Sequence, residues 1–347
     1  MTKTTITLEK RSRLDFIDIL KSIAILCIVL LHFEEGIIPK WINTLIGSFM
    51  ITAFYVVVGT MHAYKDKHVK PNRLIIKRFR QLMIPYFWFS LFIICFDCFL
   101  YFFDFKTSFD LLKDICYTLM FRGIGTLWFL PVLLVSELLF SFVQKSYIYR
   151  FITLLFTFGF FLLKNNIDFT EFSFLPTYNS SYNEYIIEVI SSVFLTIERT
   201  IIATVVISAS YWLEKKFSNH IRSNRMSSLI YGFLLIVFSS VYSLFVSFSG
   251  DFDWIRRVLV FIFLPYGVLL VIYSIINYVN NNLLLFFGKN SLIVMLTHYS
   301  FLLPIFTIVN GGELHGIYSI VYFGITVILE IPIIIIINKH FKYLIGK

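Results

Sequence analysis

The sequence predicts an all-α, polytopic integral membrane protein with about ten transmembrane helices and both termini in the cytoplasm. The first reason is composition: 58% of the 347 residues are hydrophobic and only 15% are charged, which leaves too little polar surface to cover a water-soluble globule. The second is a mean hydropathy of +0.80. The third is the recurrence of apolar runs near the ~20 residues that a helix needs to cross hydrocarbon, without the short alternating segments of a membrane β-barrel.

Apolar runs separated by polar breaks define the predicted helices in order. They lie at residues 14–33, 41–63, 82–103, 127–144, 149–164, 185–213, 227–249, 257–279, 287–308 and 317–338. The first run follows a basic N-terminal segment and superficially resembles a secretory signal. Asp18 and Lys21 interrupt its apolar core, however, and no small-residue cleavage site follows His32. We therefore expect an uncleaved first helix.

The loops set the orientation, because short cytoplasmic loops retain lysine and arginine. Basic residues gather in the predicted inner segments 64–81 and 214–226, whereas the predicted outer segment 165–184 has none. We therefore predict a single transmembrane domain over residues 1–347, with cytoplasmic tails at 1–13 and 339–347.

The segment 104–126 is the least regular part of the pattern. It mixes Asp104, Asp110 and Asp114 with Phe and Leu at roughly helical spacing. This pattern is typical of an amphipathic or re-entrant helix in an outer loop. Such a helix would be either a cap that faces a glycan or a plain interfacial helix.

Composition also argues against two other classes. The net charge of +9 would suit a nucleic-acid partner only with a soluble basic module, and none is apparent. Cys95 and Cys98 form a CxxC inside an apolar run, without a second pair or a histidine at zinc spacing. Cys27 and Cys116 also lie in or beside apolar stretches. We therefore expect no metal, no disulfide framework and no nucleic-acid partner. The lipid bilayer is an expected partner.

Ionisable residues in the first predicted helix form the sharpest pattern. Asp18 and Lys21 are three residues apart, and His32 lies eleven residues after Lys21, which is three turns plus about 20°. All three therefore share one stripe. Charges in a membrane span are costly and usually face a bundle interior or a cavity. The alternative is a simple Asp18–Lys21 ion pair at the inner interface, with His32 reaching the outer one.

Further ionisable residues lie in other predicted helices. His298 lies in the ninth span, with Ser291 two turns earlier on the same face; it is either a hydrogen-bonded core histidine or a second catalytic group. Embedded charges also occur at Glu137, Glu198, Arg199 and Glu330. Glu198 and Arg199 are adjacent and point to different faces, and we expect Glu330 to pair with Arg199.

Five stretches, in chain order, resemble the membrane proteins of acyltransferase family three. They are RLDFIDILKSIAILCIVLLHF with Asp18, Lys21 and His32; FMITAFYVVVG; RFRQLMIPYFWFSLF with Arg78 and Arg80; GIGTLWFLPVLL with Trp128; and FGKNSLIVMLTH with Asn290, Ser291 and His298. The sequence departs from the family pattern at Lys21 and Ser22, where many members have Arg and Gly. It also lacks the common His-x-Pro of the second motif.

The resemblance implies a multi-pass acyltransferase of the bacterial plasma membrane. It implies acetyl-CoA as the cytoplasmic acyl donor and a hydroxyl of a cell-surface or lipid-linked glycan as the acceptor. A neutral imidazole can accept the proton of an attacking hydroxyl, so His32 is the candidate general base or acyl carrier. The other candidate catalytic residues are Asp18 and Lys21, which would shape the donor end of a tunnel, and His298.

The resemblance also suggests binding residues. Arg78 and Arg80 are candidates for the phosphates of coenzyme A, because guanidinium groups suit phosphate; alternatively they only follow the positive-inside rule. Candidate substrate contacts are Trp128, Arg199, Glu330, Ser291 and Asn290. An outer rim at Asp251, Asp253, Arg256 and Arg257 could dock a glycan or could be a solvated loop.

Two other functions remain open at this point. An exporter or flippase of a surface polysaccharide or its precursor would also have ten spans and embedded charges, although matched halves with broken helices are not apparent. A structural scaffold of a polymer synthase would tolerate replacement of the embedded His and Arg residues. The acceptor sugar, the acyl length and the oligomeric state stay open.

Overall fold

The structure, a computed structural model, describes residues 3–33, 36–65, 71–103, 106–144, 146–166, 180–221, 224–245, 253–279, 281–302 and 317–346. These residues are almost entirely helical and include no β-strand. Eight helical stretches among them are long and apolar enough to cross a membrane: Asp15–Phe33, Lys40–Tyr64, Ile75–Phe102, Gly125–Val143, Ile190–Lys216, Arg225–Ser243, Arg257–Val279 and Tyr318–His340. The predicted all-α polytopic fold is confirmed.

The other two predicted spans correspond to shorter helical stretches. The run at 149–164 falls on α7 (Tyr147–Asn166), of which Tyr147–Thr157 qualifies as an apolar stretch. The run at 287–308 starts within α11 (Asn282–Lys289), breaks at Asn290 and continues through α12 (Ser291–Thr297) into the π-helical turn η3 (His298–Leu302). Its last part lies outside the described residues.

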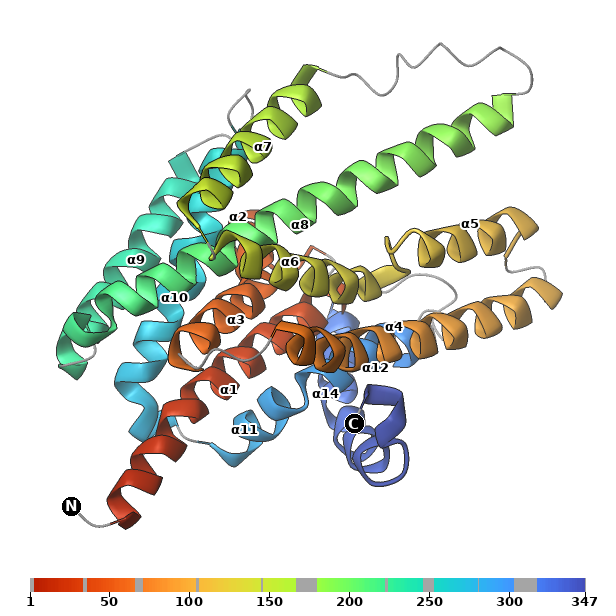
Figure 1. Ribbon diagram of the computed structural model, residues 1–347. Helices are drawn as coiled ribbons and strands as arrows, with labels where there is room; N and C mark the ends of the chain where they lie inside the picture. The colour runs from red at the N-terminus through yellow and green to blue at the C-terminus, as the bar shows by residue number, and fades with distance from the viewer. Residues whose placement is uncertain are drawn as a thin grey trace. The chain divides into compact units, whose positions relative to one another are not determined.

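The chain divides into two compact units, and the first comprises residues 1–68 and 206–342. Its helices are α1 (Lys3–Phe33), α2 (Lys40–Met50), α3 (Thr52–Lys65), the second part of α8 (Ser180–Ile221), α9 (Arg225–Phe245), α10 (Asp253–Val279), α11, α12 with η3, and α14 (Ile317–His340). Helix α1 contacts most of these helices, and α9 lies beside α10 (Figure 1). Unit 1 is therefore built around α1.

Glycines allow close backbone approaches between helices of unit 1. A Cβ on Gly288 would lie 1.8 Å from the carbonyl oxygen of Asp18, so α11 touches the backbone of α1 there. Gly232 and Gly267 face each other at the α9–α10 crossing, where a Cβ on either would come within 3.0 Å of the carbonyl of the other. Only glycine permits such backbone contact without a shift of the helices.

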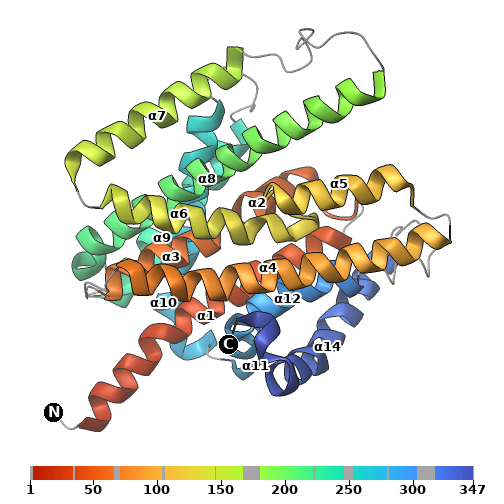
Figure 2. The same cartoon turned by 45° about the vertical axis from the view of Figure 1, so that its right-hand side comes forward.

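The second unit comprises residues 69–205 and 343–347. Its helices are α4 (Pro71–Phe102), α5 (Ser108–Leu119), the 3₁₀ turn η1 (Gly125–Trp128), α6 (Phe129–Val143), α7 and the first part of α8; the turn η4 (Lys342–Ile345) lies at its C-terminal segment. Helix α4 runs alongside α6 and α5 (Figure 2). The buried Tyr86 hydroxyl on α4 donates to the carbonyl of Thr118 on α5 at 2.7 Å.

The irregular segment 104–126 contains a helix, as its spacing predicts. Helix α5 begins with a capping box, in which the Thr107 hydroxyl accepts from the Asp110 amide and the Asp110 carboxylate accepts from the Thr107 amide. These hydrogen bonds from Thr107 lower the pKa of the Asp110 carboxyl below its usual value. The helix is thus fixed locally by its own first turn.

Candidate active site

Two histidines from distant parts of the sequence meet inside unit 1. The imidazole of His32, near the end of α1, lies with its ring centroid 5.3 Å from that of His298 in η3. The ring of Tyr299 is also 5.3 Å from His32. The first and last of the five motifs, which carry these two histidines, therefore converge at one point.

The hydrogen bonding of His298 fixes its tautomer. Its Nδ1 lies 2.6 Å from the carbonyl oxygen of Val294, one turn earlier. A carbonyl can only accept, so Nδ1 carries the proton and Nε2 keeps its lone pair. The side chain is 0% exposed, and within the described part of the chain Nε2 has no hydrogen-bond partner. The ring thus presents a fixed acceptor nitrogen in a buried setting.

The third and fourth predicted catalytic residues, Asp18 and Lys21, form the ion pair that the alternative interpretation names. The Lys21 Nζ to Asp18 Oδ1 distance is 2.6 Å, and the side chains are 24% and 15% exposed. The contact of Gly288 with the Asp18 carbonyl holds α11 against this end of α1. The pair therefore marks one end of the α1 stripe, and His32 marks the other.

Further predicted substrate contacts lie on helices packed around the histidine pair. Glu330 on α14 is 1% exposed, and both its carboxyl oxygens lie within 2.8 Å of the Thr297 hydroxyl, the residue before His298. Among the described residues of unit 1, no cation lies within ion-pair distance of it. Asn290 accepts from the Asn338 amide at 2.8 Å, and Ser291 is buried in the first turn of α12. Glu330 thus contacts the residue next to His298 in the chain.

In unit 2, Arg78 has a partner that the sequence does not reveal. Its Nε donates to the Glu137 carboxylate at 2.7 Å, and its Nη2 donates to the second Glu137 oxygen, so the pair is bidentate. Glu137 is buried in α6. Arg80 is exposed, and no described residue forms an ion pair with it. That Arg78 and Arg80 bind the phosphates of coenzyme A stays a prediction. Arg80 fits this role better, because the guanidinium of Arg78 is already bound by Glu137.

The predicted substrate contacts Trp128 and Arg199 lie against each other. The guanidinium carbon of Arg199 on α8 lies 3.9 Å from the centroid of the Trp128 ring, which is the geometry of a cation–π contact. Gly123, with φ +71°, supports Trp128, because a Cβ there would lie 2.4 Å from the Trp128 amide nitrogen. Arg199 belongs to unit 2 and Glu330 to unit 1, and the expectation that they pair stays a prediction.

One charge cluster is not apparent in the sequence. Lys106 lies between Asp97 of α4, at 2.8 Å, and Asp114 of α5, at 3.0 Å. Partial burial by itself would lower the pKa of Lys106. The hydrogen bonds and charges of the two carboxylates outweigh this effect, so the pKa is raised above its usual value. The signal for Asp97 was its position inside the apolar run FIICFDCF. Glu214 gives no such signal, because it lies just past the end of the predicted span 185–213; it is buried, and its carboxylate accepts from the Tyr266 hydroxyl at 3.3 Å.

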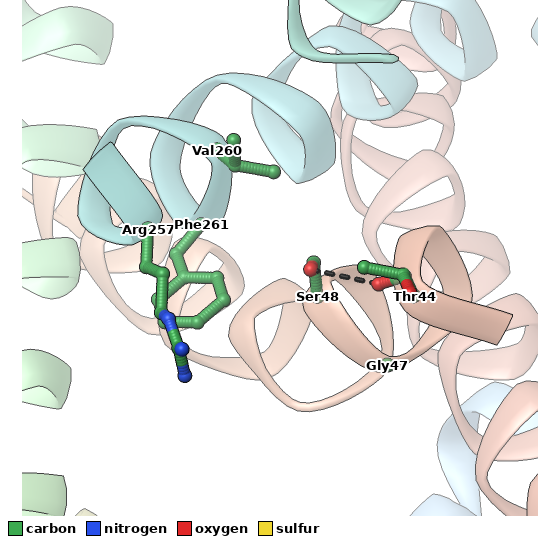
Figure 3. A pocket seen from close by; sticks show the side chains of 6 residues that line it. All are labelled: Thr44, Gly47, Ser48, Arg257, Val260 and Phe261. Atoms are coloured by element: carbon green, nitrogen blue, oxygen red, sulfur yellow. Dashed lines mark hydrogen bonds between the residues drawn. The ribbon is translucent and has the colours of Figure 1, made fainter. Parts of the chain in front are cut away.

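Each unit also contains a cavity, and the two differ in chemistry. In unit 1, a cavity of about 280 Å³ lies between α2 and α10 and is lined by Thr44, Gly47, Ser48, Arg257, Val260 and Phe261 (Figure 3). In unit 2, a cavity of about 380 Å³ lies among α4, α6, α7 and α8, and its lining is almost entirely apolar. Of the predicted outer rim, Arg257 lines the first cavity. Asp251 lies outside the described residues, and the side chains of Asp253 and Arg256 are not described.

The fold and the site together define a multi-pass membrane protein in which a buried histidine, His298, lies beside a partly exposed one, His32. Residues 14–339 match the protein family described as an acyltransferase domain. The chain therefore belongs to acyltransferase family three, as its motifs predict, and is a membrane acyltransferase. No curated protein and no solved structure matches it.

Proposed function

We propose that this protein transfers an acetyl or other short acyl group from cytoplasmic acetyl-CoA to a hydroxyl of a cell-surface or lipid-linked glycan, in the bacterial plasma membrane. The observation that carries the proposal is the histidine pair, in which the Val294 carbonyl fixes the tautomer of His298 beside His32. Such an arrangement suits removal of a proton from an alcohol. Membership of an acyltransferase family supplies the reaction class.

In this proposal His32 is the general base and His298 is a positioning residue. His298 is fully buried, whereas His32 is partly exposed and can meet a substrate. With the ring centroids 5.3 Å apart and His298 held by Val294, His298 Nε2 can accept from a His32 N–H when the His32 ring is turned toward it. His32 then takes the proton of the acceptor hydroxyl and returns it to the departing sulfur. One carbon–oxygen bond forms as one carbon–sulfur bond breaks.

In this proposal, residues of α4 bind the acyl donor. Arg80 and Lys77 are exposed, lie three residues apart on one face and stand near the start of the Ile75–Phe102 span. Guanidinium and ammonium groups at this position suit the phosphates of coenzyme A. The thioester supplies an activated acyl group. Arg78, held by Glu137, would support the helix rather than bind phosphate.

The test is complementation of a deletion strain. Wild type, His32→Ala, His298→Ala and the control His340→Ala, which changes an exposed histidine at the end of α14, are compared at equal membrane levels. O-acetyl groups on the surface polysaccharide are counted by NMR. Loss of a general base or its partner lowers the rate by about 10²–10⁴-fold. We therefore expect acetylation with His32→Ala or His298→Ala to stay near that of the deletion strain. The control should restore it fully.

Two outcomes would contradict the proposal. Full acetylation with His32→Ala would remove the catalytic assignment. A change in the amount of surface polymer, with acetylation per repeat unchanged, would instead favour the exporter.

A further inference from the structure

We propose that the cavity between α2 and α10 binds the acceptor sugar. This inference rests on the proposed function and adds to it a place and a chemical class for the acceptor. The cavity lies wholly within unit 1, on helices that also contact α1. Figure 3 shows Thr44, Gly47 and Ser48 on one side and Arg257, Val260 and Phe261 on the other.

The position of the cavity along the helices places it at one membrane face. Its lining residues lie within the first three turns of the Lys40–Tyr64 span and the first two turns of the Arg257–Val279 span. Only residues 34–39 separate the end of α1, which carries His32, from the start of α2. The cavity and His32 therefore lie toward the same face. The distribution of basic loops assigns this face to the outside, where a surface glycan is available.

The wall on α2 offers hydrogen-bond acceptors. The Thr44 hydroxyl donates to the Lys40 carbonyl at 2.9 Å, and the Ser48 hydroxyl donates to the Thr44 carbonyl at 2.8 Å. Each hydroxyl proton is thus already used, and the oxygen lone pairs remain. These oxygens suit a ligand that donates several O–H groups.

The wall on α10 offers complementary groups. The exposed Arg257 carries N–H donors, and the ring of Phe261 offers an apolar surface against which the C–H groups of a sugar can pack. A volume of about 280 Å³ lies just below the ~300–1,000 Å³ typical of small-molecule sites. It suits one sugar residue better than a coenzyme. Donors, acceptors and an aromatic face in one small cavity match a sugar and not a lipid chain.

Gly47 makes the cavity testable without disturbing the packing. A Cβ at Gly47 meets nothing within 4 Å, and the same is true of Gly324 on α14. Gly47→Leu therefore fills the cavity, whereas Gly324→Leu adds the same side chain elsewhere in unit 1. Both substitutions also raise helix propensity.

The experiment measures two activities of each purified full-length variant. One is transfer of labelled acetyl from acetyl-CoA to oligosaccharides prepared from the unacetylated polysaccharide of the deletion strain. The other is release of CoA in the absence of oligosaccharide, by transfer to water. We expect Gly47→Leu to reduce oligosaccharide acetylation at least tenfold while CoA release stays at the wild-type rate. Gly324→Leu should leave both rates unchanged.

A second variant keeps the test decisive if Gly47→Leu does not fold. Arg257→Gln should raise the KM for oligosaccharide roughly tenfold, the scale of one lost charge-assisted hydrogen bond, with CoA release unchanged. Wild-type transfer by Gly47→Leu, or an unchanged KM in folded Arg257→Gln, would overturn the cavity assignment alone. Absence of any transfer by the wild type would overturn the proposed function, and the cavity assignment with it.

Discussion

The two units treat buried ionisable groups differently. In unit 2, Arg78 binds Glu137 and Lys106 binds Asp97 and Asp114. Among its described residues, unit 1 has one such pair, Lys21 with Asp18 on α1, but its two most buried groups have only neutral partners: His298 binds a backbone carbonyl and Glu330 binds a hydroxyl.

This difference separates groups that hold helices together from groups that can take part in proton transfer. A charge neutralised by a bidentate partner holds helices together, and its proton is not easily moved. A histidine or carboxyl bound only by neutral groups can still exchange a proton, and its presence in a membrane interior is a sign of function. Substitutions at these buried groups test the division, and one at the exposed cap of α5 provides a reference outside it; the expected effects decrease in the order given.

The largest effect is expected in unit 2, at the bidentate pair. Glu137→Leu leaves the Arg78 guanidinium partly buried without its partner, so unfolding should become easier by about 3–5 kcal/mol. Adding Arg78→Met should recover most of this loss, because no lone charge remains. Thermal unfolding in detergent measures the stability of each variant. If the double variant is as unstable as Glu137→Leu, the pair is not what holds α4 against α6.

The same double variant sharpens the donor assignment. If Arg78 only supports the helix, the rescued protein should keep the wild-type KM for acetyl-CoA. An increase of tenfold or more would show that Arg78 contacts the donor itself.

An intermediate effect is expected in unit 1, at the buried carboxyl. Glu330→Gln preserves volume and the contact with Thr297 but cannot exchange a proton. We expect acyl transfer to fall about tenfold or more, equivalent to about 1.4 kcal/mol of barrier, with the Tm within a few degrees of wild type. Glu137→Gln is the matched control and should show the reverse pattern, a lower Tm with little loss of rate per folded molecule. If the two variants changed the Tm and the rate of acyl transfer in the same way, the proposed difference between the two units would be wrong.

The smallest effect is expected at the first turn of α5. The pKa of Asp110 is lowered in the folded state by its hydrogen bonds to Thr107. Its stabilisation is therefore fully present above the unfolded pKa, near 3.8, and is lost as the pH falls through the lower folded value. Asp110→Asn should reduce stability by less than about 1 kcal/mol at pH 7 and leave acyl transfer unchanged. The difference in Tm between the two proteins should shrink toward zero on acidification, and a difference that grew instead would be inconsistent with the cap.

The sequence carries most of the fold because hydropathy and helical period are local signals. They define the first helix and its stripe of Asp18, Lys21 and His32 without any knowledge of packing. The bond between Arg78 and Glu137 joins residues 59 positions apart, so it depends on how α4 meets α6. The proximity of His32 and His298 likewise depends on tertiary packing. Family motifs marked both histidines, but their 5.3 Å separation is a property of the folded unit.

The contact between Gly288 and the Asp18 carbonyl limits how this protein can move. Two backbones in direct touch cannot slide past each other by a helical turn without separating first, because the ridges on either side of the glycine would collide. The first helix and α11 should therefore travel as one rigid piece. Cross-linking α1 to α11 should therefore leave acyl transfer unchanged, because catalysis does not require these two helices to separate.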